Sequence, residues 1–142
     1  IGDSDHRGYV SYVYYSDEAA GVRKYHADPA DGDAELALFG TEDFAEDREG
    51  ISIFPTGEGE GYVIVSDQQA QGFNLYPRQG APGAPHRHEL IRKVRVAATE
   101  SDGSESSAVA FDETFRHGLF VAMSDDRTFH LYRWEDIAAA LR

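Results

Sequence analysis

Carboxylates crowd residues 46–49, directly before a short apolar run at 51–54. The alternation in that run predicts a β-strand, a rigid element that would hold the carboxylates at fixed separations. Such groups repel one another unless a cation lies between them, and Ca²⁺ takes six to eight oxygen ligands. Asp47 and Glu49 are therefore candidate metal ligands, and Arg48 is a candidate contact for phosphate oxygens. The alternative is a solvated acidic loop before a strand.

The charge balance limits the classes of partner. The 142 residues include 26 Asp and Glu against 13 Lys and Arg, which gives a formal net charge of −13. No excess positive charge is available to neutralise phosphates, so we expect no nucleic-acid partner. No apolar run approaches the length of a membrane span, so we expect no membrane partner either. Cysteine is absent, which excludes disulfides, thiolate metal sites and a cysteine nucleophile.

A repeated pattern organises the chain. Each copy is an apolar strand that ends in Ser-Asp, then a tight polar turn, then an alternating strand that ends in Tyr. The repeated serines are 50 and 58 residues apart, and strand repeats of this period are typical of propeller blades. The three copies cover residues 8–25, 61–76 and 118–132.

Further strands complete these units. We expect inner strands at 51–54 and 107–111, and outer strands at 36–39 and 89–96. Only residues 134–141 predict a helix, with Glu135 and Asp136 in its first turn.

The predicted fold class is all-β: a β-propeller fragment of about two and a half four-stranded antiparallel blades with a short C-terminal helix. The units are a partial blade at 8–40, a full blade at 47–97 and a partial blade at 105–134. A propeller needs at least about four blades to close its ring, so we expect residues 1–142 to be the C-terminal part of a larger propeller. The start at Ile1, without a signal peptide, fits that expectation. The alternative is a self-contained antiparallel sandwich of about ten strands.

Repetition places equivalent residues in equivalent positions. Asp17, Asp67 and Asp125 would end the second strand of their blades on one face of the disc, and Glu105 lies in the acidic loop 100–105. A cluster of carboxylates on that face would bind divalent cations, and the cations would attract phosphate. The alternative, which is favoured for Asp67 and Asp125, is that Ser-Asp simply forms a turn.

The remaining basic and histidine residues give weaker signals. Arg23, Lys24, Arg48 and Arg78 could contact phosphate oxygens, although a solvated outer strand face is favoured for Arg23 and Lys24. The run at 86–88 holds two histidines in a Pro/Gly-rich loop, where a solvated tip is favoured over a transition-metal site.

Several motifs occur in a specific order. The run Asp47-Arg48-Glu49-Gly50 is followed by Gly61-Tyr62-Val63-Ile64-Val65-Ser66-Asp67-Gln68, and then by Tyr76-Pro77-Arg78-Gln79-Gly80. The chain closes with Gly118-Leu119-Phe120-Val121-Ala122 and Trp134-Glu135-Asp136-Ile137-Ala138. In this order and spacing, over essentially the whole chain, the sequence resembles the β-propeller phytases.

The resemblance implies a six-bladed propeller that hydrolyses phytate, a phosphorylated small molecule, and that needs Ca²⁺ to activate water and screen the phosphates. It also suggests a secreted or periplasmic location. Asp47 and Glu49 match the acidic pair of the family and are the candidate catalytic residues. Either Asp17 or Glu18 matches its acidic strand end, and Gln68 joins Arg48 as a candidate substrate contact. The full set of candidate metal ligands is Asp17, Glu18, Asp47, Glu49, Asp102 and Glu105.

One departure from the family pattern leaves two functions open. The family carries Asp-Gly-x-x-Asp-Thr-Asp-Gly-Ile-Asp before its last inner strand. Here Asp102, Gly103 and, less closely, Glu105 remain, but residues 106–108 read Ser-Ser-Ala. Loss of those carboxylates should weaken a calcium site. The first hypothesis is a Ca²⁺-dependent phosphomonoester hydrolase whose isolated 142-residue part is inactive. The second is a catalytically degenerate propeller that binds ligands or proteins.

Overall fold

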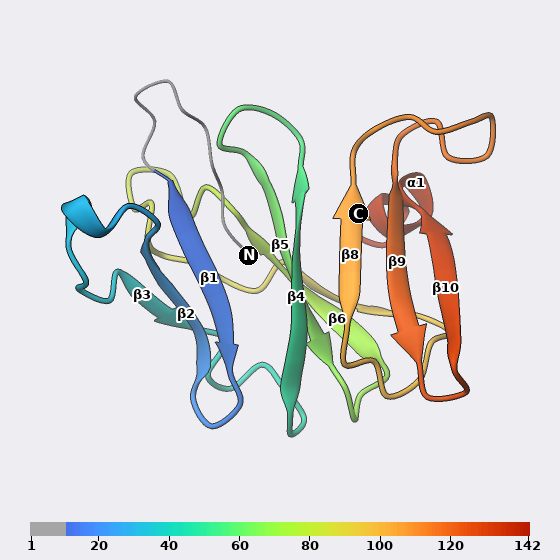
Figure 1. Ribbon diagram of the computed structural model, residues 1–142, viewed down its shortest axis with the longest axis horizontal. Helices are drawn as coiled ribbons and strands as arrows, with labels where there is room; N and C mark the ends of the chain where they lie inside the picture. The colour runs from blue at the N-terminus through green and yellow to red at the C-terminus, as the bar shows by residue number, and fades with distance from the viewer. Residues whose placement is uncertain (1–10) are drawn as a thin grey trace.

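The computed structural model describes residues 11–142 as three antiparallel sheets, which lie side by side (Figure 1). Each sheet takes its strands from one of the three repeated segments and the runs beside it. The first sheet contains β1 (Tyr12–Asp17), β2 (Gly21–His26) and β3 (Ala37–Phe39). The second contains β4 (Arg48–Pro55), β5 (Gly61–Asp67), β6 (Gly72–Pro77) and β7 (Arg92–Arg95). The third contains β8 (Ser104–Ser107), β9 (Leu119–Ser124) and β10 (Thr128–Arg133), and helix α1 (Trp134–Ala139) follows it.

The all-β prediction, with antiparallel blade-like sheets and a short C-terminal helix, is confirmed. The inner strand predicted at 107–111 is wrong, because β8 covers Ser104–Ser107. Its pairing with β9 ends at Ser107 opposite Leu119, so the apolar residues beyond it have no partner strand. Val109 and Phe111 are consequently exposed. Glu105 therefore lies within a strand and not in the preceding loop.

A glycine stands at the start of β5 and directly before β9 for a steric reason. Gly61 has φ of 142°, and a Cβ atom there would lie 2.2 Å from the carbonyl oxygen of Phe54. At Gly118, φ is 97° and a Cβ would lie 2.2 Å from the carbonyl oxygen of Ser107. Only a residue without Cβ permits this backbone and this approach to the preceding strand.

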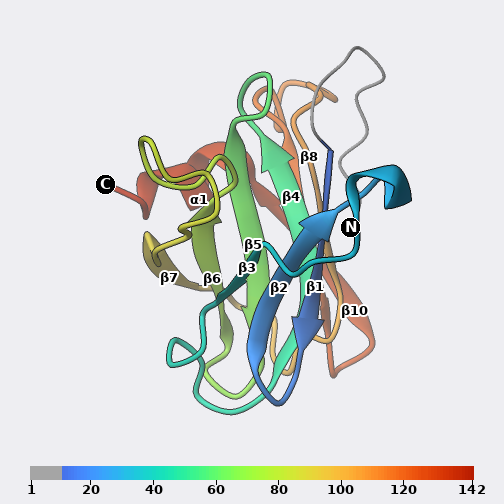
Figure 2. The same cartoon turned by 90° about the vertical axis from the view of Figure 1, so that its left-hand side faces the viewer.

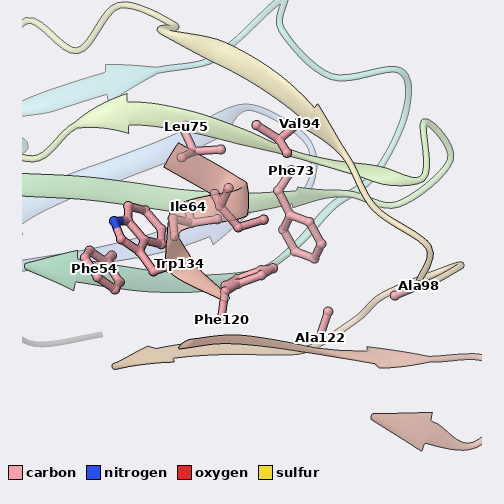
Figure 3. Packing of buried hydrophobic residues seen from close by; sticks show 10 residues of the cluster. Phe54, Ile64, Phe73, Leu75, Val94, Ala98, Phe120, Ala122 and Trp134 are labelled. Carbon is pink, nitrogen blue, oxygen red and sulfur yellow. The ribbon is translucent and has the colours of Figure 1, made fainter. Parts of the chain in front are cut away.

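Strand β5 is buried on both faces, which explains its continuous apolar run. Val63 and Val65 pack towards the first sheet in a cluster with Tyr14, Phe39 and Tyr76. The alternate residue Ile64 packs towards the third sheet, in the cluster that Figure 3 shows. The second sheet is therefore the central layer of the described structure, and its two faces carry the two hydrophobic cores.

Aromatic contacts fix the third sheet and the helix against the second sheet. The rings of Phe54 and Trp134 stack with centroids 3.5 Å apart, which joins β4 to the start of α1 (Figure 3). Phe73 of β6 meets Phe120 of β9 edge to face at 4.7 Å. The edge-to-face geometry of the second pair adds to the stability that buried area provides.

The three described sheets are too few to close a propeller ring, which needs about four or more blades. The outward face of the third sheet remains apolar, with Phe129 72% exposed and Leu131 54% exposed. Such a face is suited to a further sheet. In residues 11–142, no helix is long and apolar enough to cross a membrane.

The loop histidines are not the solvated tip that the sequence favoured. His88 is buried and its ring lies 4.5 Å from the ring of Phe39, between the first two sheets. Its Nδ1 donates to the carbonyl oxygen of Pro77 at 2.7 Å, so Nε2 carries the lone pair that faces the Lys24 ammonium at 3.3 Å. Lys24, predicted to be solvated, is only 1% exposed. Pro85 binds the same ammonium group through its carbonyl oxygen at 2.9 Å.

Substitution of Gly61 by Ala should destabilise the fold by about 2 kcal/mol or more, since it adds strain at a positive φ and an overlap with Phe54. Gly57→Ala in the same hairpin is the matched control, because a Cβ at that position would lie 3.7 Å from its nearest neighbour, an ordinary contact distance. Chemical denaturation measures the free energy of unfolding of both variants. Equal stabilities for the two variants would contradict the steric role of Gly61.

Acid should destabilise the fold in part through His88. Burial and, to a lesser extent, the nearby Lys24 charge lower the pKa of His88 to about 4. Between about pH 6.5 and 4, the His88 imidazole binds a proton more readily in the unfolded chain than in the folded one. The free energy of unfolding therefore falls as pH falls through that window. The loss approaches about 3 kcal/mol at most. Denaturation of wild type and His88→Asn across pH 4–7 should show a shallower slope for the variant, and parallel slopes would refute this origin.

Candidate functional site

Acidic residues from all three sheets gather at one end of the molecule, where the β1–β2 turn, the start of β4 and the loop before β8 meet (Figure 1). There they border a shallow depression of about 330 Å³. Three of the predicted metal ligands and one predicted substrate contact are on its wall. The lining residues are Tyr14, Tyr15, Ser16, Glu18, Arg48, Glu49, Gly50, Ile51 and Asp102.

The repeated serines position this wall by bonding from one sheet to the next. Ser16 Oγ at the end of β1 donates to the carbonyl oxygen of Glu49 at 2.6 Å. Ser66 Oγ at the end of β5 donates to the carbonyl oxygen of Ser101 at 2.5 Å, next to Asp102. Sequence reasoning assigned Ser-Asp to a turn and missed this role. The recurrence of Ser at the same place in each repeat was the available signal.

Gly50 allows the second and third sheets to approach closely at the depression. A Cβ at this position would lie 2.6 Å from the carbonyl oxygen of Asp102 and 2.8 Å from Cα of Gly103. The register of β4 against β5 shifts between Arg48 and Ile51, so a bulge turns the backbone here. Bulges re-aim side chains in this way. Glu49 therefore lies inside the bulged strand and not ahead of it.

The electrostatics of Glu49 show that the carboxylates lie near one another. Burial raises the pKa of Glu49, and the negative charges of Glu18, Asp102 and Asp47 raise it further. Within residues 11–142, no Lys or Arg side chain forms an ion pair with any of these four groups. In the described part of the chain, no ion pair thus offsets their mutual repulsion.

Two glutamines span the rim between the second and third sheets. Gln69 Nε2 donates to Asp47 Oδ2 at 2.9 Å and to Gln68 Oε1 at 3.1 Å. Gln68 Nε2 in turn donates to Asp102 Oδ1 at 2.5 Å. The predicted substrate contact Gln68 therefore orients a predicted metal ligand here, and Gln69 is a rim residue that sequence reasoning did not single out.

Arg48 lies in the wall of the depression but is largely buried. Its guanidinium donates to the carbonyl oxygen of Glu18 and lies 5.1 Å from the centre of the Phe44 ring. The side chain thus ties the β1–β2 turn to the start of β4, in addition to adding one positive charge at the rim.

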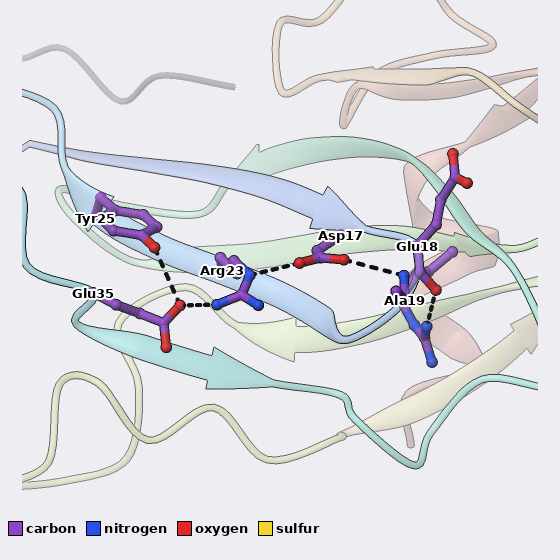
Figure 4. Close-up of polar contacts among 7 residues, drawn as sticks. Asp17, Glu18, Ala19, Arg23, Tyr25 and Glu35 are labelled. Atoms are coloured by element: carbon purple, nitrogen blue, oxygen red, sulfur yellow. Dashed lines mark hydrogen bonds and ion pairs between the residues drawn. The ribbon is translucent and has the colours of Figure 1, made fainter.

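Asp17 takes part in a separate network (Figure 4). Its Oδ2 accepts from Arg23 Nε at 2.7 Å, and Arg23 also pairs with Glu35, which accepts from the Tyr25 hydroxyl. The Arg23 bond lowers the pKa of Asp17. The side chain of the adjacent Glu18 points in another direction (Figure 4). Of the two residues that matched the family's acidic strand end, Glu18 is the one that lines the depression.

The other repeated aspartates support the structure. Asp67 is 1% exposed, accepts from the backbone N–H of Ala45 at 3.0 Å and pairs with Lys93 Nζ at 3.3 Å. Asp125 accepts from the hydroxyl of Thr99. Glu105 is exposed on β8 and is absent from the wall of the depression, although it was predicted as a metal ligand.

The donor set suits a hard cation by its chemistry, since it offers only carboxylate and amide oxygens with unrelieved repulsion. Over residues 11–142, however, no three His, Asp or Glu side chains converge tightly enough to hold an ion as they stand. The carboxylates surround the depression and do not meet at one point.

The fold and the depression define a class: a blade-built β-propeller protein with carboxylates from successive blades at one end. Comparison with known proteins agrees with this class. The family model described as Phytase matches residues 4–142, so the chain belongs to the phytase family. It is also similar to a 3-phytase of Bacillus subtilis (strain 168), with 25% identity over 141 residues. That match covers 91% of this chain and 37% of the length of the relative.

Removal of the Glu18 charge should lower the pKa of Glu49, because one of the like charges that oppose its ionisation is lost. NMR titration of the Glu49 carboxyl in wild type and Glu18→Gln measures the change. Glu58→Gln, in the β4–β5 hairpin, is the matched control and should leave that pKa unchanged. An unaltered Glu49 pKa in Glu18→Gln would show that the two side chains are not neighbours.

Proposed function

We propose that the protein to which these blades belong is a Ca²⁺-dependent phosphomonoester hydrolase of phytase type. Phytate or a similar phosphorylated small molecule is the proposed substrate. The observation that supports this best is the depression where Glu18, Glu49 and Asp102 come together from three sheets, with no ion pair to a Lys or Arg of residues 11–142. The family membership supports the same reaction class.

In this proposal Glu18, Asp47, Glu49 and Asp102 hold calcium with their carboxylate oxygens. A bound calcium ion would supply a water of lowered pKa and offset the charge of the phosphate. The amide groups of Gln68 and Gln69 hold two of these carboxylates in place. Asp17 contributes less because it forms an ion pair with Arg23. Glu105 contributes less because it does not line the depression.

Glu49 is the proposed proton acceptor for the attacking water. In the metal-free site burial and three neighbouring carboxylates raise its pKa, and a bound calcium ion would lower it by offsetting those charges. Ser16 fixes its backbone through the bond to the carbonyl oxygen at 2.6 Å, so the side chain starts from a defined point. Arg48 adds positive charge at the rim, where it would favour a phosphate oxygen.

A second candidate function is a propeller that has lost catalysis and binds ligands or proteins. The run Ser106-Ser107-Ala108 favours it, because carboxylates of the family pattern are missing there. The position of Glu105 favours it too, since this remaining acid does not line the depression. Both functions predict a ligand at this end, and only the first predicts turnover.

The deciding experiment measures phosphate release from phytate by the full-length protein, with Ca²⁺ and with a chelator. We expect release that needs Ca²⁺ and that falls at least about 100-fold in Glu49→Gln, the usual scale for loss of a general base. Glu58→Gln serves as the control for the loss of one surface charge and should keep wild-type rates. Release that survives chelation would remove calcium from the proposal.

No release from phytate or from simpler phosphomonoesters in either condition would favour the binding function. The isolated 142-residue chain should not turn over substrate, because the three described sheets are too few to close a ring. Turnover by that chain alone would show that the remaining blades are not needed for catalysis.

A further inference from the structure

A second, smaller cavity lies at the opposite end of β4 from the acidic depression. The depression meets β4 at Arg48 and Glu49, whereas the cavity includes Gly59 in the hairpin that follows β4. Figure 2 shows the β4–β5 hairpin and the β1–β2 turn at opposite ends of the molecule. The cavity measures about 180 Å³ and is lined by Tyr12, Tyr14, Lys24, Gly59, Arg78, Gln79 and Pro85.

Lys24 presents a buried positive charge to this cavity. The residue is only 1% exposed, because alternation along β2 turns it inward, with Val22, while Arg23 faces the ion-pair network on the other side. Its ammonium donates to the carbonyl oxygen of Pro85 at 2.9 Å and meets Nε2 of His88 at 3.3 Å. It also lies 3.9 Å from the centre of the Tyr12 ring.

None of these contacts supplies a negative charge. No carboxylate of residues 11–142 forms an ion pair with Lys24, and burial alone lowers the pKa of this group to about 8. A buried ammonium without a counter-ion is unfavourable by several kcal/mol unless an anion joins it or it loses its proton. The neutral imidazole of His88 and the Tyr12 ring lessen that cost without removing it.

The rest of the wall also suits an anion. Arg78 also lines the cavity, and its guanidinium donates to the carbonyl oxygen of Glu60 at 3.4 Å. The side-chain oxygen of Gln79 accepts from the backbone N–H of Gly61 at 3.2 Å. The N–H donors of the same amide therefore point away from Gly61. The volume equals that of about six waters at ~30 Å³ each, enough for one small anion and a few waters. A large polyphosphorylated molecule would not fit.

We propose that this cavity binds one small oxyanion of the orthophosphate class, with Lys24 as the principal ligand. Tetrahedral phosphate suits donors that approach from several directions, and Lys24 of β2 and Gln79 of the loop after β6 line the cavity from different elements. The site is separate from the acidic depression and does not use calcium. It therefore stands whether or not the proposed hydrolase activity is found.

Isothermal titration calorimetry with inorganic phosphate, in chelator and without divalent cations, tests the proposal. The chelator removes any phosphate that cations would hold at the acidic depression. Wild type should bind one phosphate saturably, and Lys24→Met should weaken binding at least 10-fold. Arg92→Met, which removes an exposed cation from β7, should bind like wild type. Equal binding by wild type and Lys24→Met, or no saturable binding by wild type, would overturn the proposal.

A second measurement uses wild type only, so it does not depend on how a variant folds. NMR titration of the Lys24 ε-amino group in chloride should give the pKa near 8, and saturating phosphate should raise it, because a bound anion favours the charged amine. Phosphate that leaves this pKa unchanged would contradict contact with Lys24. Acetate at equal ionic strength is the comparison, and saturation by acetate without preference for phosphate would overturn the assignment to the orthophosphate class.

Discussion

The acidic end of this protein depends on hydrogen bonds that cross from one sheet to the next. Ser16 holds the carbonyl oxygen of Glu49, and Ser66 holds that of Ser101, each from a strand end of the preceding sheet. Because a serine hydroxyl reaches only a neighbouring backbone, these bonds fix the separation of adjacent sheets at this end. The carboxylates of Glu49 and Asp102 are thereby held near each other, although they are 53 positions apart in the sequence.

Packing of the cores makes that arrangement rigid. Strand β5 is buried on both faces, so the first and third sheets are each seated on the second through a separate hydrophobic cluster. The stack of Phe54 on Trp134 belongs to the cluster beneath the third sheet, which also contains Phe120. A carboxylate cluster can tolerate its own repulsion only where such packing prevents the sheets from separating. The stable core thus supports an electrostatically unfavourable site.

The sequence was sufficient for most of the strands, for the antiparallel sheets and for the family, because those depend on local alternation and on a repeat. It was not sufficient for side-chain direction. Arg23 and Lys24 were both assigned to a solvated face, yet neighbours on a strand point to opposite sides, and Lys24 is buried. Asp17 and Glu18 could not be separated until the structure showed Arg23 bound to the first. The displacement of β8 to Ser104–Ser107 was hidden because serines carry no apolar signal.

The central claim is that carboxylates from successive sheets share a divalent cation at the acidic depression. Crystals of the protein grown with Ca²⁺ test it most directly. The account predicts an ion whose ligands include oxygens of both Glu18 and Glu49, at about 2.3–2.6 Å. A structure in Ca²⁺ with no ion between these two residues, or with their side chains turned away from each other, would contradict it.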